Sequence, residues 1–395
     1  MNNDVICSQP FTKIHNLPGK NYAPCCWSNY SQFGPQNTLP FDYFDGEEFR
    51  RIRKEMLLGD KTEFLKSVCK KCYKLEDENN DSPRKQFPVN ERMLENFNAD
   101  GSLKETNNRF VHVSINVYGN YCNLECYACK SSNSTSRNSA LKKLDPKWSK
   151  ISGFSITDNL IADVDKDQFN NIVNQLVKYS HIIATVELIG GEPMLMKSHF
   201  KLLDALITCG QSKQIMLSYV SNMTLMNLDI MKKYFDNFKR THIQWSVDAL
   251  EEKNYWLRYP TDWNSTIKNV FDVQRYLNIT KKGKIRATIT PSLLAIPSLL
   301  QTYKWLYSRN LISKENFIFN VITEPEILKP RNLPNKLKEK IALSVKSVSE
   351  FHYNDLMQER NEKEFQLAIQ YCDELDKSRG TNWRSIFPEV AKYVN

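Results

Sequence analysis

Three cysteines within eight residues are the group in this sequence with the clearest chemistry. Cys122, Cys126 and Cys129 are separated by three and then two residues, directly after an apolar run at residues 110–117 that is typical of a β-strand. A tetrahedral zinc site takes four ligands, and no fourth candidate follows closely. Three thiolates can instead hold three corners of a [4Fe–4S] cluster and leave one iron open. The alternatives at this point are a partial zinc knuckle and buried structural thiols.

The segment Cys122-Asn-Leu-Glu-Cys126-Tyr-Ala-Cys129 resembles the signature of the radical S-adenosylmethionine (radical SAM) superfamily. The resemblance implies that the open iron chelates the amino and carboxylate groups of S-adenosylmethionine (SAM). An electron from the cluster then breaks a carbon–sulfur bond and releases a 5′-deoxyadenosyl radical, which takes hydrogen from a substrate. The signature usually has an aromatic residue just before its last cysteine. Here Ala128 holds that place and Tyr127 precedes it, so both are candidates for the cofactor contact.

A second short motif, Gly190-Gly191-Glu192-Pro193, follows the next predicted strand. Two glycines let the backbone pass close to a ligand and adopt angles that other residues avoid. Pro193 fixes the exit of the turn and has no N–H, so backbone carbonyls and the Glu192 carboxylate can accept hydrogen bonds from an ammonium group. Alone, such a motif is most often a simple turn. Downstream of the cysteines it matches the radical SAM Gly-Gly-Glu motif for the methionyl amino group.

Further polar residues end the next two predicted strands. Asn222 ends the third strand, and Ser246 and Asp248 end the fourth. The latter pair resembles the Ser-x-Asp that often reaches SAM in twitch-type radical SAM proteins; as an alternative, Asp248 caps the helix that follows. Arg258 offers a guanidinium suited to paired hydrogen bonds with the methionyl carboxylate, or else is a surface arginine.

Half of the ten cysteines lie in the first hundred residues. Cys7 is followed by the pair Cys25-Cys26 after a turn, and Cys69 and Cys72 form a Cys-x-x-Cys pair. Four thiolates binding a metal can stabilise a segment that is too small to fold alone. Zinc and iron–sulfur both fit this spacing. We take Cys25 as the fourth ligand and keep Cys26 as the alternative.

The layout of these N-terminal cysteines resembles the SPASM or twitch auxiliary-cluster domains of radical SAM enzymes. A predicted helix at residues 46–59 separates the Cys-Cys pair from the Cys-x-x-Cys pair. The resemblance implies a second [4Fe–4S] cluster with four protein ligands, and zinc is the alternative. The expected ligands are Cys7, Cys25, Cys69 and Cys72.

A repeating strand–helix pattern begins at residue 110 and must position these residues. The predicted strands are residues 110–117, 184–189, 215–221, 242–247, 285–290 and 317–322. The predicted helices between them are residues 167–178, 197–209, 227–238, 264–277 and 296–308. Six βα units in succession predict an α/β protein with a parallel sheet curled into a partial (β/α)6 barrel of the TIM type. The carboxyl ends of such strands meet at one rim, where all the candidate residues above would lie.

Three segments are expected along the chain. Residues 1–100 are predicted to form the auxiliary metal domain and residues 108–330 the radical SAM core. Residues 331–395 are predicted to be a helical extension with helices at 336–353 and 355–377.

Polar residues alternate along one face of several predicted strands. A barrel interior packed only for stability would carry Val, Ile and Leu there, so polar residues indicate a wet cavity for a cofactor and a polar substrate. The residues are His112, Ser114, Asn116, Glu187, Gln244, Ser246, Asp248, Arg286, Thr288 and Thr290.

Composition sets the remaining expectations. With 41% hydrophobic and 25% charged residues, the 395-residue chain is typical of a soluble globular protein. It contains no apolar run of membrane-span length and no signal peptide, so a cytoplasmic location and no membrane partner are expected. The net charge of +9 includes basic runs that can meet phosphates, nucleic acid or an acidic peptide, although solvated helix faces are favoured.

The sequence thus predicts a radical SAM enzyme that acts on a peptide or a small polar metabolite. The resemblance implies an electron donor such as flavodoxin or ferredoxin. An enzyme that modifies RNA or a nucleotide is the first alternative, because of the basic runs. A non-catalytic iron–sulfur or zinc scaffold is the second, but a scaffold needs neither the glycine motif nor a polar barrel interior.

Overall fold

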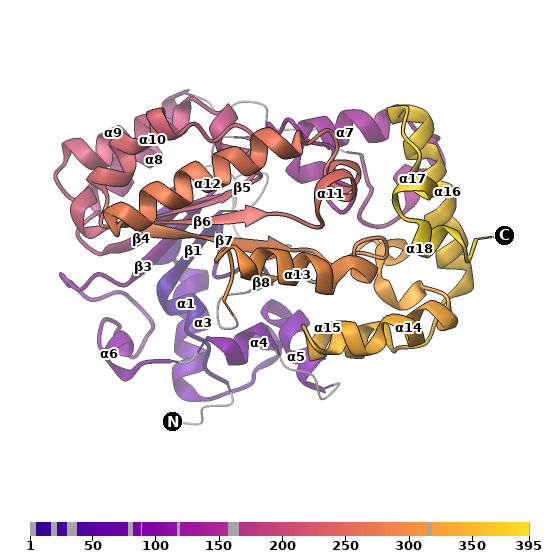
Figure 1. Cartoon of the computed structure of the whole chain (residues 1–395). Helices are drawn as coiled ribbons and strands as arrows, with labels where there is room; N and C mark the ends of the chain where they lie inside the picture. Colours follow the sequence, from indigo (N-terminus) through magenta and orange to yellow (C-terminus); the bar gives the residue numbers. More distant parts are fainter. Residues whose placement is uncertain are drawn as a thin grey trace.

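The structure is a computed structural model of the 395-residue chain (Figure 1). It describes residues 5–16, 22–29, 38–77, 82–87, 89–116, 119–156, 166–313 and 318–394. Within these residues one eight-stranded sheet has the order β2-β1-β3-β4-β5-β6-β7-β8. Only β1 and β2 pair in antiparallel fashion; the other neighbours are parallel. The strands are β1 Lys13–Asn16, β2 Tyr22–Ala23, β3 Val111–Ile115, β4 Ile183–Leu188, β5 Met216–Ser221, β6 Arg240–Ser246, β7 Gly283–Ile289 and β8 Ile318–Phe319.

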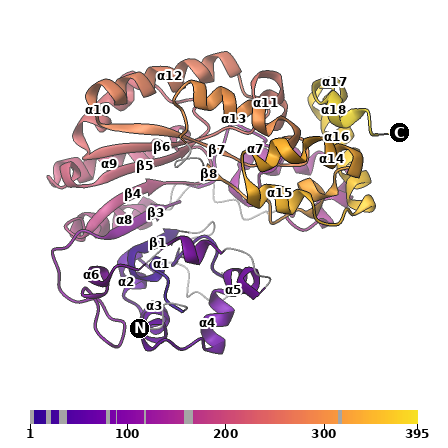
Figure 2. The same ribbon diagram turned by 60° about the horizontal axis from the view of Figure 1, so that its bottom comes forward.

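Helices cover one face of this sheet, and the expected α/β fold with a parallel partial barrel is confirmed (Figures 1 and 2). Alternate strand residues such as Ile243, Ile285 and Ile289 are buried. Each helix follows a strand, as the pattern predicts. The covering helices are α8 Lys166–Lys178, α9 Ser198–Thr208, α10 Leu228–Asn237, α12 Trp263–Thr280 and α13 Leu299–Ser308.

The opposite, inner face of the sheet is polar. Register pairs Ser114 with Glu187 and Gln244 with Arg286, so these side chains share one face. Gln244 on β6 donates from Nε2 to Glu187 Oε1 on β4 at 3.1 Å, reaching across the intervening strand β5. The predicted alternation of polar residues is therefore confirmed for these strands, and the inner face lines a concave space.

The N-terminal segment is joined to this sheet in a way that the sequence did not predict. Strand β1 pairs with β3 in parallel, with Ile14 opposite Val113. Phe41 stacks on Tyr179, which follows α8, with ring centroids 4.3 Å apart. The segment and the barrel therefore share one hydrophobic core. Its helices are α1 Gln9–Thr12, α2 Pro40–Phe44, α3 Glu47–Leu58, α4 Glu63–Val68, α5 Lys70–Asp77 and α6 Glu91–Leu94.

The C-terminal helices lie on the side toward which the arrows of β6 and β7 point (Figure 1). The prediction of a single helix at residues 336–353 is wrong, because two helices occupy this segment. Ser349 caps the second one: its side chain accepts a hydrogen bond from the N–H of His352 at 3.3 Å. The helix predicted from residue 355 begins only after Asn361, whose side chain caps it. The helices near this side are α7 Thr135–Lys142, α11 Glu251–Leu257, α14 Asn335–Lys346, α15 Glu350–Leu356, α16 Glu362–Arg379, α17 Trp383–Ile386 and α18 Pro388–Ala391.

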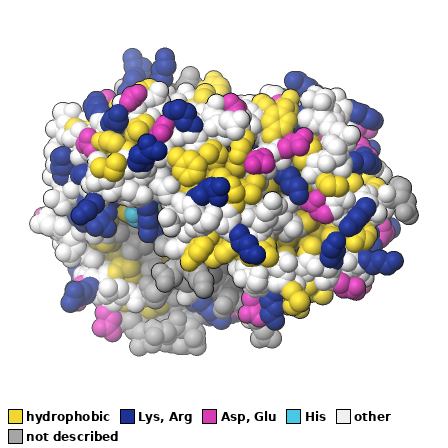
Figure 3. Space-filling view, in the orientation of Figure 1, with side chains coloured by type: hydrophobic (Ala, Val, Ile, Leu, Met, Phe, Trp, Pro, Cys, Tyr) yellow, Lys and Arg dark blue, Asp and Glu magenta, His cyan; other side chains and the backbone are white. Residues whose placement is uncertain are grey.

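Charged residues are mixed on the outside. On the face shown in Figure 3, Lys and Arg side chains lie singly or in small groups among acidic and apolar ones. In the described part of the chain, no helix is both long enough and apolar enough to cross a membrane.

Candidate functional site

The loop after β3 brings the three predicted cysteines together. Burial, together with the smaller effect of nearby Cys126, raises the pKa of the Cys122 and Cys129 thiols to about 12. Polar side chains of the next segment hold the loop backbone: Ser136 Oγ donates to the Cys122 carbonyl at 2.5 Å, and Ser134 Oγ donates to the Leu124 carbonyl at 3.0 Å. Cys126 and Cys122 both raise the pKa of Cys129, as expected for thiols on one short loop.

Arg258 reaches the sulfur of Cys126, with 3.8 Å between Nη1 and Sγ. Two backbone hydrogen bonds produce this approach: Glu125 N donates to the Tyr259 carbonyl at 2.6 Å, and Tyr127 N donates to the Leu257 carbonyl at 2.7 Å. These bonds flank Cys126 on one segment and Arg258 on the other. The alternative that Arg258 is a surface arginine is wrong, because its side chain is only 12% exposed.

Two further arginines, which sequence analysis missed, hold the same loop. Arg137 on α7 donates to the carbonyls of Tyr127 and Cys129, each at 3.3 Å. Arg379 on α16 donates to the Glu125 carbonyl at 2.6 Å. Their guanidinium charges suit a loop that binds a negatively charged group. No local sequence signal marks them, because they come from distant helices.

Asp248 forms an ion pair with Arg258, with 2.8 Å between Oδ2 and Nε. Its Oδ1 accepts from Arg258 Nη2 at 3.1 Å and from the N–H of Thr290 at 2.9 Å. The capping alternative for Asp248 is wrong, since α11 follows Leu250 with no side-chain cap. Ser246 ends β6 opposite Thr288 of β7, on the same rim.

The glycine motif packs directly against the cysteine loop. Gly190 and Gly191 have φ values of +85° and +49°. A Cβ on Gly191 would lie 2.1 Å from the Tyr121 carbonyl oxygen, and Glu192 N donates to that oxygen at 2.7 Å. Only glycine fits this close approach. The motif thereby fixes the residue that precedes Cys122.

The Glu192 carboxylate is fully buried and joins two loops. It accepts from Ser221 Oγ at 2.9 Å and from the N–H of Asn222 at 2.8 Å. Burial raises its pKa to about 7. Pro193 begins the short 3-10 helix Pro193–Leu195, whose Met194 N–H also donates to Glu192 at 3.3 Å. The side chain that we expected to face a ligand is therefore engaged by protein donors.

Asn222 connects the loop after β5 to the cysteine loop. Its Nδ2 donates to Asn123 Oδ1 at 3.0 Å, and Asn123 Nδ2 donates to Thr224 Oγ1 at 2.9 Å. Asn123 lies directly after Cys122 in the sequence. All four predicted strand-end positions thus meet at one rim.

The structure corrects the expectation that Tyr127 contacts the cofactor. Its side chain is buried, its ring lies 5.2 Å from that of Trp256, and its hydroxyl lies 3.6 Å from the sulfur of Cys372. It packs in the core between α11 and α16 and offers no ring to a cofactor. Ala128, next in the chain, is only partly buried.

Among the described residues, no three His, Cys, Asp or Glu side chains are arranged to hold a single metal ion. One zinc ion would require its sulfurs about 2.3 Å from a common centre. A [4Fe–4S] cluster instead binds each thiolate at a separate iron.

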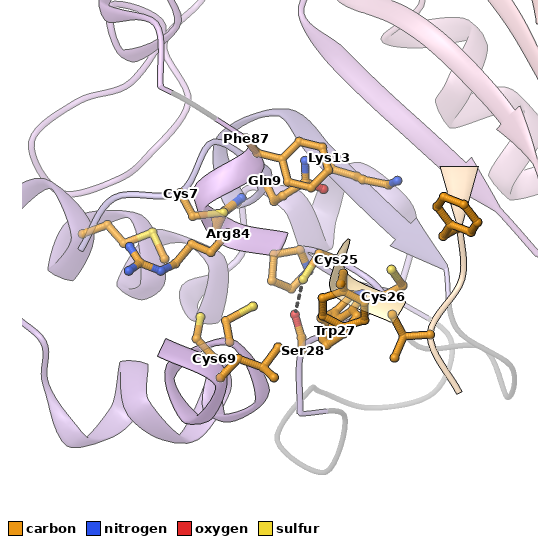
Figure 4. A pocket seen from close by; sticks show the side chains of 18 of the residues that line it. Cys7, Gln9, Lys13, Cys25, Cys26, Trp27, Ser28, Cys69, Arg84 and Phe87 are labelled. Carbon is orange, nitrogen blue, oxygen red and sulfur yellow. Dashed lines mark hydrogen bonds between the residues drawn. The ribbon is translucent and has the colours of Figure 1, made fainter. Parts of the chain in front are cut away.

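The N-terminal cysteines form a second group, seen in Figure 4. Burial, together with smaller effects of nearby Cys25 and Cys72, raises the pKa of the Cys7 thiol to about 12. Burial also raises the pKa of Cys69, and nearby Cys25, Cys7 and Cys72 contribute to this increase. Cys26 points away from the group in Figure 4, and besides Cys25 its charged neighbours are Lys13 and Glu187 of the inner face. The structure therefore places Cys25, and not Cys26, with the other three.

A cavity of about 540 Å³ adjoins this second group. It lies between the N-terminal segment and the part of the chain around β8 and α15, and therefore at the open edge of the sheet. Arg84 in its wall pairs with Glu76, with 2.6 Å between Nη2 and Oε2. Its other lining residues include Lys13, Trp27, Phe87, Phe319, Val321 and Phe351.

No family model and no curated protein matches the chain. Similar solved structures include native anSMEcpe with bound AdoMet, at 16% identity and a TM-score of 0.41, over 63% of this chain and 62% of that chain. Streptococcus suis SuiB bound to S-adenosylmethionine has 17% identity and a TM-score of 0.31, over 57% and 43% of the two chains. SuiB bound to precursor peptide SuiA has 15% identity and a TM-score of 0.36, over 81% and 52%. The matched region spans less than two thirds of each of these chains.

Proposed function

We propose that this chain is a radical SAM enzyme whose cluster is bound by Cys122, Cys126 and Cys129. The observation that carries the proposal is the contact between the cysteine loop and the glycine motif at the carboxyl ends of a parallel sheet. Glu192 N donates to the Tyr121 carbonyl at 2.7 Å, next to Cys122. A cysteine loop that served only packing would not require two left-handed glycines beside it.

The residues present fit a cluster and SAM. When bound, a three-cysteine [4Fe–4S] cluster supplies the electron that cleaves SAM to the 5′-deoxyadenosyl radical. Neighbouring atoms occupy the place of a Cβ at both glycines, Asn116 Oδ1 at Gly190 and the Tyr121 carbonyl oxygen at Gly191, so the turn packs tightly against its surroundings. We assign the glycine carbonyls to the ammonium group of SAM. Asn116 adds an acceptor: its Oδ1 is buried without a hydrogen-bond partner among the described residues and lies beside Gly190.

The remaining rim residues position the loops and place compensating charge beside the cysteines. Glu192 holds the loops after β4 and β5 together, so we assign it a positioning role. Arg258 places positive charge beside Cys126, and Asp248 fixes its orientation through the ion pair at 2.8 Å. Ser246, Asn222 and Ala128 lie on the same rim and complete the proposed SAM site.

We further propose that Cys7, Cys25, Cys69 and Cys72 bind a second [4Fe–4S] cluster, with zinc as the alternative. Four thiolates leave no open iron, so this group would pass electrons or shape the adjoining cavity. Arg84 supports the assignment, because its positive charge acts on Cys7 and Cys69.

A peptide or small polar substrate and a donor such as flavodoxin or ferredoxin complete the proposal. The polar inner face of the sheet supports a polar substrate. RNA or nucleotide modification remains the alternative reaction class, and a non-catalytic scaffold the alternative class of protein.

Electron paramagnetic resonance of the reduced, anaerobically reconstituted protein tests the SAM site. An open iron beside the glycine motif should bind SAM, so adding SAM should change the signal of the cluster. Buffer without SAM is the control. A signal that SAM leaves unchanged would contradict the proposed site.

The second group is tested in a variant whose Cys122, Cys126 and Cys129 are all Ala, so that only N-terminal metal is measured. Cys26→Ser should keep about four irons per chain, because its thiol faces away from the group. Cys25→Ser should lose them.

Elemental analysis after anaerobic preparation decides between the outcomes. The reverse result for the two serine variants would contradict the ligand assignment. About one zinc and no iron would replace the second cluster by a structural zinc site.

A further inference from the structure

The inner face of the sheet carries basic residues with a single acidic partner. Among the described residues of β1 and β3 to β7, side chains on this face include Lys13, Lys284 and Arg286 as well as His15, His112 and His242, and Glu187 is the only carboxylate. Burial lowers the pKa of His242 to about 4, so the positive charge comes from the lysines and the arginine. Surface charges, in contrast, are mixed in sign (Figure 3). Positive charge without matching carboxylates is a local feature of the concave side of the sheet.

Glu187 is already occupied by its neighbours. Its Oε2 lies 3.5 Å from Lys13 Nζ and 3.1 Å from His112 Nε2, and its Oε1 accepts from Gln244 at 3.1 Å. Although burial opposes the charged form, Lys13 and His112 hold the pKa of Glu187 below its usual range. The Glu187 carboxylate therefore pairs with Lys13 and is not available as a partner for the cations on β7.

Those cations are Arg286 and Lys284. Arg286 Nε is buried without a hydrogen-bond partner, and in the described part of the chain neither side chain has an acidic partner. Burial lowers the pKa of Lys284, and the charges of Arg286 and Arg240 lower it further. A buried, unpaired guanidinium nitrogen loses hydration without compensation, so an anionic ligand would stabilise it.

The cavity at the open edge of the sheet gives access to this face. Lys13 lines the cavity and also belongs to the inner face. Phe319 of β8 also lines the cavity, but it pairs with Ile289 of β7 and so lies on the face opposite to Arg286. Lys13 is therefore the residue that connects the cavity to the inner face, along which a ligand would extend to reach the cations on β7.

The cavity wall favours a peptide over a nucleic acid. Apolar residues such as Trp27, Phe87 and Phe319 dominate it, and they suit amino-acid side chains. Among the described lining residues, Arg84 pairs with Glu76 and Lys13 pairs with Glu187, so each lysine or arginine there already has an acidic partner. A phosphate backbone would need several cations along its path.

We infer that the inner face binds a carboxylate of a peptide substrate, with Arg286 and Lys284 as the anion-binding residues. Arg286 matches this role because a guanidinium can bind a carboxylate through two parallel hydrogen bonds. The substrate is then an acidic peptide. That the bound peptide is a substrate rests on the proposed radical SAM function, whereas the binding of a carboxylate to this face does not.

A random decapeptide library tests the inference on the full-length reconstituted protein, with SAM present and no reductant. Wild-type protein should enrich peptides rich in Asp and Glu, and Arg286→Gln should lose that enrichment. The leading peptide should bind Arg286→Gln and Lys284→Gln about tenfold more weakly. Arg275→Gln, an exposed position on the outer helix α12, is the matched control and should bind as wild type does.

Circular dichroism confirms that each variant is folded before binding is compared. Enrichment without an acidic bias, or equal binding by wild type and both inner-face variants, would overturn the inference. A ten-nucleotide polyuridine that binds more tightly than the peptide, and loses affinity in Arg286→Gln, would replace the peptide by a nucleic acid. Because no reductant is present, these results are independent of whether SAM is cleaved.

Discussion

Gly191→Ala should destabilise the protein and remove most SAM cleavage. The new methyl group would lie 2.1 Å from the Tyr121 carbonyl oxygen, and the φ of +49° disfavours any side chain. Overpacking together with the left-handed backbone should cost about 3 kcal/mol of stability. The obstacle is backbone, so the cysteine loop must move, and a displacement of about 1 Å can reduce turnover about a hundredfold.

Gly210→Ala is the matched control for this prediction. Gly210 also has a positive φ, of +77°, but a Cβ there would meet nothing within 4 Å. It should lose only the backbone contribution of about 1–2 kcal/mol and keep cluster content and SAM cleavage. Thermal unfolding, iron analysis and product formation would be compared for both variants. Equal effects of the two substitutions would contradict the role given to the contact with Tyr121.

The barrel could be predicted from the sequence because each strand and helix carries its own local period. Strands β4 to β7 alternate buried apolar residues with polar ones, and the helices between them have one apolar face. Strand β1 could not be found in this way. It has only four residues, Lys13–Asn16, and its partner β3 lies nearly a hundred residues away.

The cysteine and glycine motifs could be predicted because their residue types and spacing are local. The residues that contact these motifs could not be predicted. Arg137 and Arg379 bind the carbonyls of the cysteine loop from α7 and α16, and nothing in the sequence near Cys126 indicates them. The tertiary fold also placed Tyr127 in the core, although its position beside Cys126 suggested a cofactor contact.

The choice between Cys25 and Cys26 shows the same limit. Adjacent residues have equal spacing to Cys7, Cys69 and Cys72, so the sequence could not separate them. The backbone turns the two side chains apart: Cys25 lies 3.2 Å from Ser28 Oγ on the side of the group, and Cys26 is directed toward Lys13. Only the three-dimensional arrangement distinguishes a ligand from its neighbour.

Replacing Cys122, Cys126 and Cys129 together with Ala should abolish SAM cleavage completely. Without these thiolates, the cluster that would supply the electron to SAM cannot be held beside the glycine motif. Cys209→Ala, at the end of α9 and outside both cysteine groups, is the control and should keep activity. The triple variant should keep its fold, since Arg137 and Arg379 hold the loop through backbone carbonyls, and the N–H groups of Glu125 and Tyr127 bond the carbonyls of Tyr259 and Leu257.

Formation of 5′-deoxyadenosine tests the central claim most directly. The reduced, reconstituted wild-type protein is incubated anaerobically with SAM, and the product is quantified by chromatography and mass spectrometry. The account predicts 5′-deoxyadenosine from the wild type and from Cys209→Ala, and only the protein-free background from the triple variant. Equal product from the triple variant and the wild type, or none from a wild-type protein loaded with its cluster, would contradict it.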